Sequence, residues 1–186
     1  MDLSVLIPAR NEKYLQRTIE SVLENIEADT EIIAICDGYW PSPPIQDHPR
    51  VNLIHHSEAR GQRPSINEAA RIARGKFIMK LDAHCAVGPG FDRILCEDWQ
   101  PGWTIVPRMY NLDVETWRPR FIDDWDMALK KAKVHDYMYA GWNDKGELRA
   151  QYYTGMTYYE LHNRKQEIDE TMCCMGPGWF LNKEEF

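Results

Sequence analysis

Short apolar, β-prone runs alternate with segments of helical periodicity over the first 82 residues, and this alternation constrains the fold more than any other feature of the sequence. A strand–helix–strand–strand–helix–strand order with short turns is typical of an open, mostly parallel α/β sheet with helices on both faces. The expected elements are strands at 3–7, 31–36, 51–56 and 76–82, and helices at 13–25 and 65–74. Their predicted boundaries are Pro8 after the first strand, Pro64 at the first position of the second helix and Gly75 after that helix.

Polar residues follow three of these strands, in the segments 8–12, 37–38 and 82–84. In an open α/β sheet, ligands bind beyond the carboxyl ends of the strands, so we expect these segments to share one site. Because side chains along a strand alternate faces, Asp82 and His84 are predicted to point the same way and to form half of a divalent-metal site. Cys85 then faces the opposite side and is expected in the core.

Composition excludes several classes of protein. A net charge of −7 and a pI near 5.4 argue against a nucleic-acid partner. No apolar run is long enough to span a membrane, and the first residues lack the basic region of a signal peptide. The five cysteines contain no C-x-x-C pair, so reduced thiols and a cytoplasmic location are expected.

The remainder of the chain is less regular. A turn at 87–91 is predicted to lead into a short helix that runs to about residue 96. A strand is predicted at 103–107, a possible helix near 122–134 and a further strand at 171–180. Asn182 is a good helix N-cap, with Glu184 and Glu185 suited to the first turn. Because the sequence stops where that helix begins, we expect it to be a C-terminally truncated part of a longer chain.

Several motifs occur in a characteristic order: Ile7-Pro8-Ala9-Arg10-Asn11-Glu12, Cys36-Asp37-Gly38, Gly61, Gly75 and Leu81-Asp82-Ala83-His84-Cys85. Together they resemble the nucleotide-binding half of a GT-A-fold glycosyltransferase of family 2 type. The Asp-Ala-His-Cys form is closest to the polypeptide N-acetylgalactosaminyltransferases, although most relatives carry a carboxylate in place of His84. The resemblance covers residues 3–91 well and 171–186 loosely. It implies one GT-A (Rossmann-like) domain over 1–186, with a nucleotide-sugar-binding part (1–107), an aromatic-rich connection (108–170) and the start of the acceptor side (171–186).

The resemblance also implies roles for individual residues. Asp82 and His84 would hold Mn²⁺ or Mg²⁺, Asp37 would hold the base or ribose, and Arg10 would either neutralise phosphate or remain a solvated surface arginine. The full nucleotide-binding set is Pro8, Ala9, Arg10, Glu12, Asp37, Gly61, Arg63 and Asp82. Gly176 and Trp179 would lie on the acceptor side, Trp179 either stacking on a sugar or packing in the core. The catalytic residues and the third metal ligand are expected beyond residue 186, since the spacing of Asp123, Asp124, Asp126 and His135 does not support them as substitutes.

We therefore expect a metal-dependent glycosyltransferase that takes a nucleotide-diphosphate sugar, a UDP-sugar, and transfers the sugar to a hydroxyl of a glycan, protein or small molecule. Two alternatives stay open. One is a non-catalytic nucleotide- or sugar-binding module or a degenerate relative. The other is a sugar-phosphate nucleotidyltransferase, which is disfavoured because the loop at 9–12 lacks glycine.

Overall fold

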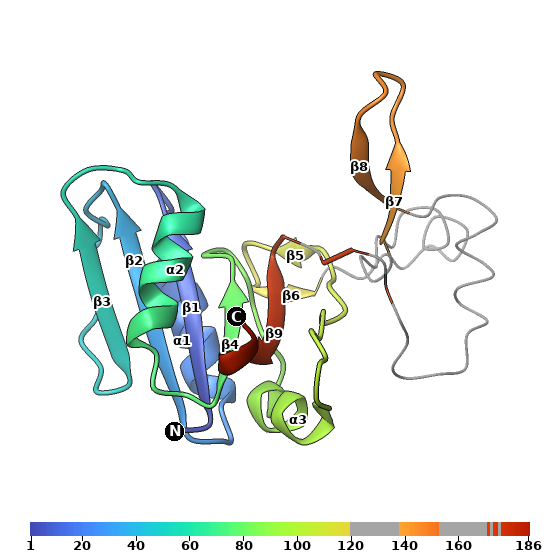
Figure 1. Ribbon diagram of the computed structural model, residues 1–186. Helices are drawn as coiled ribbons and strands as arrows, with labels where there is room; N and C mark the ends of the chain where they lie inside the picture. Colours follow the sequence, from blue (N-terminus) through green and yellow to red (C-terminus); the bar gives the residue numbers. More distant parts are fainter. Residues whose placement is uncertain (120–137, 153–170, 172, 175) are drawn as a thin grey trace. The chain divides into compact units, whose positions relative to one another are not determined.

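The computed structural model describes residues 1–119, 138–152, 171, 173–174 and 176–186. The chain divides into two compact units, Met1–Ile105 with Gly176–Phe186, and Val106–Met175 (Figure 1). These boundaries lie close to those predicted between the nucleotide-binding part and the aromatic-rich connection. The treatment of 1–186 as one domain stays a prediction.

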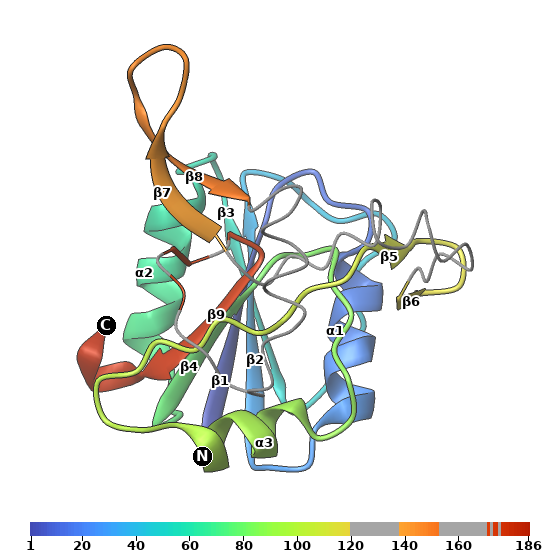
Figure 2. The same cartoon turned by 90° about the vertical axis from the view of Figure 1, so that its right-hand side faces the viewer.

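The first unit is built on a five-stranded sheet with the order β3-β2-β1-β4-β9 (Figures 1 and 2). The strands are β1 (Leu3–Ala9), β2 (Thr30–Asp37), β3 (Val51–His56), β4 (Phe77–Leu81) and β9 (Gly178–Asn182). The first four run parallel, and β9 pairs antiparallel with β4. The predicted mostly parallel α/β sheet is confirmed.

Helices cover both faces of this sheet, as predicted (Figure 2). Helices α1 (Leu15–Asn25) and α3 (Phe91–Asp98) pack on one face, and α2 (Gln62–Ile72) packs on the other. Alternate residues of β1 serve the two cores: Leu3, Val5 and Ile7 belong to the α1 side and Leu6 to the α2 side. Burial on both faces is why these strands read as continuous apolar runs in the sequence.

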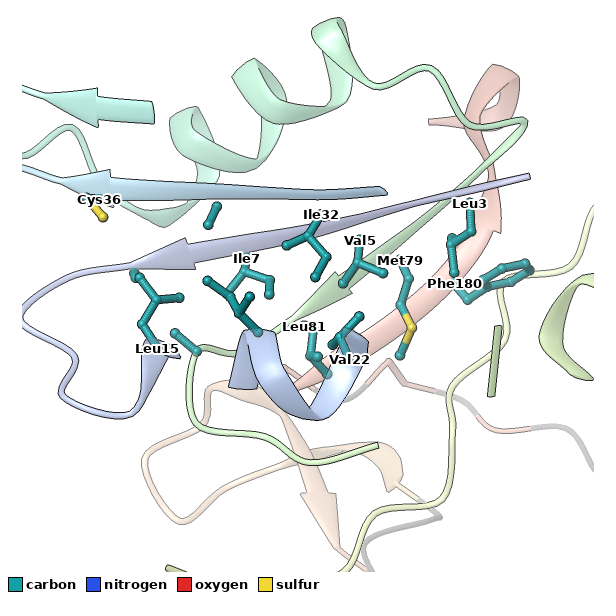
Figure 3. Close-up of a cluster of buried hydrophobic side chains, with 14 of the residues drawn as sticks. Leu3, Val5, Ile7, Leu15, Val22, Ile32, Cys36, Met79, Leu81 and Phe180 are labelled. Carbon is teal, nitrogen blue, oxygen red and sulfur yellow. The ribbon is translucent and has the colours of Figure 1, made fainter. Parts of the chain in front are cut away.

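The core on the α1 side is drawn in Figure 3, where Leu15 and Val22 approach the sheet. Both residues are essentially inaccessible to solvent, as is Ile19 between them. Their spacing of four and three residues places them on one stripe of the helix. The helical periodicity that predicted α1 therefore reports the face that packs on the sheet.

The boundaries predicted at Pro8 and Pro64 are wrong. Pro8 does not end β1, which continues to Ala9; at Pro8 the strand has a neighbour on one side only, because its pairing with β4 stops at Leu6. Helix α2 begins at Gln62, so Pro64 occupies its third position, still within the first turn where the missing N–H is tolerated.

Gly75 has a different role from the predicted helix end. Helix α2 already ends at Ile72. A Cβ on Gly75 would lie 2.5 Å from the backbone nitrogen of Ser4, so this position needs glycine because the chain passes against β1.

The later predicted strands are shorter than expected. Of residues 103–107, Ile105 alone forms a bridge, to Phe180, with backbone hydrogen bonds of 2.7 and 2.8 Å. The strand predicted at 171–180 is found as β9, which starts at Gly178. The short helix predicted to follow the turn at 87–91 is confirmed as α3, which starts at Phe91. The possible helix at 122–134 lies outside the described residues, as do Asp123, Asp124, Asp126 and His135.

The predicted cap at Asn182 is confirmed, since its side-chain oxygen accepts a hydrogen bond of 2.9 Å from the backbone nitrogen of Glu184. It starts a short 3₁₀ helix, η1 (Lys183–Glu185). In the second unit, β5 (Leu112–Asp113) pairs antiparallel with β6 (Arg118–Pro119), and β7 (Met138–Trp142) pairs antiparallel with β8 (Leu148–Tyr152). Within the described ranges, no helix has the length and apolarity needed to cross a membrane. All five cysteines are free thiols.

Candidate nucleotide site

An open pocket of about 340 Å³ lies where β1, β2 and β4 end and α2 begins. The chain runs outward from β1 through β2 to β3 and then returns to place β4 on the other side of β1. Such a switch in strand order leaves a crevice at the carboxyl edge of the sheet, where open α/β sheets bind ligands. The lining residues are Pro8, Ala9, Arg10, Glu12, Asp37, Gly61, Gln62, Ser65, Asp82, Ala83 and His84.

The structure brings together all the residues predicted for nucleotide and metal binding except Arg63, which does not line the pocket. Gly176 and Trp179 do not line it either. Sequence reasoning missed Gln62 and Ser65, because the second helix was predicted to begin at residue 65 rather than at 62. The roles assigned to the lining residues remain predictions.

Asp37 is buried at the end of β2 and accepts three hydrogen bonds. His56 Nδ1 and the backbone nitrogen of Arg60 donate to Oδ1 at 2.9 and 2.8 Å, and the backbone nitrogen of Gly61 donates to Oδ2 at 2.8 Å. Burial alone raises the pKa of Asp37, but these hydrogen bonds outweigh it and hold the pKa below its ordinary value. The ionised carboxylate therefore fixes the turn at residues 60–61 that leads into α2.

His56 connects Asp37 to helix α2. Its Nε2 lies 3.0 Å from Glu68 Oε2, and Glu68 also accepts a hydrogen bond of 3.1 Å from Arg60. Because carboxylates only accept, both ring nitrogens of His56 must carry a proton when both bonds form. These contacts give His56 a structural role beneath the wall of the pocket.

The predicted geometry of Asp82 and His84 is wrong in one respect. Strand β4 ends at Leu81, so the two residues lie in the following turn instead of on one face of a strand. Both nevertheless line the pocket. The alternation of side chains between two faces applies only within a strand, so it does not explain why Asp82 and His84 lie together. The turn after β4 places both at the rim of the pocket.

His84 is oriented by Glu12. Its Nδ1 lies 2.9 Å from Glu12 Oε2, which means that Nδ1 carries the proton and Nε2 is left as the ring's other donor or acceptor. Histidines that bind metals commonly donate their second ring N–H to a carboxylate in this way. The loop after β1 thus supports the imidazole offered by the turn after β4.

Asp82 is held from three directions. Its Oδ1 accepts hydrogen bonds from Lys80 Nζ and, at 3.4 Å, from Gln62 Nε2, while its backbone nitrogen donates to the carbonyl of Pro177 at 2.9 Å. Lys80 also donates to the carbonyl of Gly176. Sequence reasoning missed this lysine, because a single lysine within an apolar strand usually indicates an exposed position.

The donor set fits a divalent cation in part. A carboxylate and an imidazole held by a carboxylate are suitable for Mn²⁺ or Mg²⁺. Among the described residues, however, no group of three or more His, Cys, Asp or Glu side chains could hold a metal ion. Asp82 and His84 therefore suit an ion that completes its coordination with substrate phosphate and water, as Mg²⁺ commonly does.

Two neighbouring residues are structural. Burial, with a smaller contribution from the charge of Asp82, raises the pKa of Cys85 to about 11, so at neutral pH its thiol is protonated and is a poor metal ligand. Trp179 packs against the core on the α2 side and stacks on Phe186, with ring centroids 5.6 Å apart. For Trp179, packing in the core is the alternative that the structure favours.

A family model described as glycosyl transferase family 2 matches residues 4–184. The chain therefore belongs to glycosyl transferase family 2. The match spans the strand ends that form the pocket, together with β9.

Among solved structures, the chain is similar to the S. aureus protein TarS. The identity is 18% to TarS 1-349 (TM-score 0.40) and 17% to TarS 1-349 in complex with UDP (TM-score 0.44), each alignment covering 52% of this chain and 31% of that one. For a further TarS structure the identity is 17% and the TM-score 0.43, over 52% of this chain and 19% of that one. Comparison with curated protein sequences gives no match.

Proposed function

We propose that the pocket binds a nucleotide-diphosphate sugar, a UDP-sugar, and that the chain serves the transfer of the sugar to a hydroxyl acceptor. The observation that carries this proposal is the convergence of the 8–12 loop, Asp37, Gly61 and the 82–84 turn on one pocket at the carboxyl edge of the sheet. Membership of glycosyl transferase family 2 supports the same class of reaction.

Within this proposal, different residues of the chain contact different parts of the nucleotide-sugar donor. Arg10 is exposed on the pocket rim and brings positive charge toward the phosphates. Asp37 holds the 60–61 turn through Oδ1 and Oδ2, and faces the base or ribose with its remaining acceptor capacity. Gly61, with φ of 99°, begins α2 in a backbone conformation that favours glycine.

Asp82 and His84 would hold the divalent cation, Mn²⁺ or Mg²⁺, with Glu12 fixing the imidazole. When bound, such an ion supplies positive charge that offsets the negative charge developing on the diphosphate leaving group. The described residues then position the donor, and the acceptor hydroxyl belongs to a glycan, a protein or a small molecule.

Two finer assignments rest on sequence alone. The Asp-Ala-His-Cys form at 82–85 supports a relationship to the polypeptide N-acetylgalactosaminyltransferases within the wider family. The five unpaired cysteines support a cytoplasmic location. Fractionation of cells that express the full-length protein tests the location.

Calorimetric titration of the chain with UDP, with and without Mn²⁺, beside GDP and TDP, tests the binding proposal. Binding that prefers UDP and tightens with Mn²⁺ is expected, and no binding to any of the three contradicts the proposal. Asp82→Ala should abolish the gain from Mn²⁺, whereas Asp98→Asn, an exposed change on α3, should retain it. An unchanged gain in the Asp82 variant would remove that residue from the metal site. Release of UDP from a UDP-sugar by the full-length protein separates an enzyme from a non-catalytic module.

A further inference from the structure

Lys80 is among the largest fully buried side chains of the described residues, with only 2% of its side chain exposed. It sits near the carboxyl end of β4, one residue before the strand ends. Lysine is almost never buried to this degree unless its ammonium group is paired, since an unpaired buried charge is strongly disfavoured. Its partners therefore reveal why it is there.

Within the described part of the chain, the ammonium group has two oxygen partners, Asp82 Oδ1 and the carbonyl oxygen of Gly176. Asp82 retains 21% exposure and lines the pocket, so the pair lies at the boundary between the core and the site. The backbone nitrogen of Asp82 donates to Pro177, the residue after Gly176. Lys80 and Asp82 together fix the turn that leads into β9.

The charges around the pocket are unfavourable for a diphosphate. Among the residues that the structure describes, Glu12, Asp37 and Asp82 line it, against one lining cation, Arg10. Lys80 adds a second positive charge directly behind Asp82. It also occupies Oδ1, one of the two carboxylate oxygens that Asp82 could offer to a metal ion.

We propose that Lys80 is a resident counter-cation for Asp82, and that it sets how far nucleotide binding in this pocket depends on a divalent metal ion. The inference rests on the proposed function, since it concerns the same pocket. The ammonium group offsets the charge of Asp82 when no metal ion is present. It also repels an incoming divalent cation and competes for the same carboxylate. Lys80 is thus a positioning residue that acts through Asp82.

Removing the charge should have two opposite effects. In Lys80→Met, UDP binding without metal weakens because the pocket loses a cation. Affinity for Mn²⁺ increases because Asp82 is released. The ratio of the UDP dissociation constant in EDTA to that in Mn²⁺ should rise by about tenfold or more, since charges within about 5 Å interact strongly even at an effective dielectric constant of about 20. If Lys80 had only a structural role, its replacement would weaken UDP binding equally in EDTA and in Mn²⁺, or would lower the ratio by displacing Asp82.

The experiment is calorimetric titration of UDP in EDTA and in saturating Mn²⁺ for the unmodified chain, Lys80→Met and Lys80→Gln. The glutamine variant keeps a hydrogen-bond donor without the charge and serves if the methionine variant fails to fold. Lys76→Met is the matched control. It removes one exposed positive charge from the residue just before β4, four residues or about 13 Å from Lys80. A higher ratio in the Lys80 variants alone supports the proposal. An unchanged or lower ratio, or the same rise in the control, overturns it.

Failure of the proposed function would be recognised separately, as absence of UDP binding by the unmodified chain in both conditions. Mn²⁺ binding alone, followed by the electron paramagnetic resonance signal of the free ion, then decides on Lys80. Tighter Mn²⁺ binding by Lys80→Met than by the unmodified chain supports the competition for Asp82. Equal or absent binding overturns it.

Discussion

Replacing Asp37 by asparagine tests the role of this carboxylate beneath the pocket wall. The change preserves shape and removes charge. Asp37 Oδ1 accepts from His56 and from the Arg60 backbone, and Oδ2 accepts from the Gly61 backbone. Asparagine has one acceptor oxygen, so its amide nitrogen must face at least one of these N–H donors.

The expected loss of unfolding free energy is about 3 kcal/mol. A hydrogen bond to a charged group contributes about 1.5–3 kcal/mol, and a buried N–H left without an acceptor costs about 1–3 kcal/mol. Relaxation of the turn at residues 60–61 offsets part of the sum. Asp47→Asn, in the exposed loop after β2, changes the same chemical group and should alter stability by less than about 0.5 kcal/mol.

The pH dependence makes this prediction specific. Because the pKa of Asp37 is lowered in the folded state, its contribution is fully present above its unfolded pKa of about 3.8 and is lost as the pH falls through the folded pKa. The stability difference between the unmodified chain and Asp37→Asn should be constant from about pH 7 to pH 5 and shrink below about pH 4.

Urea unfolding followed by tryptophan fluorescence, at closely spaced pH values, measures this difference for both variants. A difference below about 0.5 kcal/mol at pH 7 would refute the hydrogen-bond accounting. A full difference that persists well below pH 4, where the folded chain still allows measurement, would refute the assignment of the effect to the ionised carboxylate.

Two further stability predictions concern residues that pack against the strands of the sheet or are hydrogen-bonded to them. Gly75→Ala should lower the free energy of unfolding by about 1–3 kcal/mol, because the new Cβ would lie 2.5 Å from the backbone of Ser4. Gly88→Ala, whose Cβ would have nothing within 4 Å, is its control, and equal losses in the two urea titrations would contradict the packing argument. Asp92→Ala should cost about 3–4 kcal/mol, because this fully buried carboxylate accepts hydrogen bonds from the Thr30 hydroxyl and three backbone N–H groups. A loss below about 1 kcal/mol in the same assay would show that water replaces these bonds.

Much of the fold was predictable because each strand of the parallel sheet is buried on both faces. Leu3, Val5 and Ile7 serve one core while Leu6 serves the other, so the run is apolar throughout and its limits are visible in the sequence. The candidate site followed from the polar residues after those strands. Asp37 and Asp82 could be placed near each other without any knowledge of their hydrogen bonds.

The parts that escaped prediction depend on contacts between distant residues. The burial of Lys80 requires the Gly176 carbonyl, which is 96 residues away and is delivered by the turn before β9. Gly75 reads as a helix end in the sequence, whereas its contact with Ser4 exists only once β1 is in place. The start of α2 was predicted too late in the chain. Proline is favoured at the first helical position, but Pro64 is equally acceptable at the third position, where the structure places it.

The bridge between Ile105 and Phe180 joins two segments of the first unit that flank residues 106–175. The chain leaves the sheet-bearing unit just after Ile105 and has returned by Gly176, and its two paths are hydrogen-bonded to each other shortly after that return. The strands β1 to β4 all precede residue 106, and the segments on either side of 106–175 meet at this bridge. A change in the length of 106–175 therefore leaves the hydrogen-bond ladder of β1 to β4 in place.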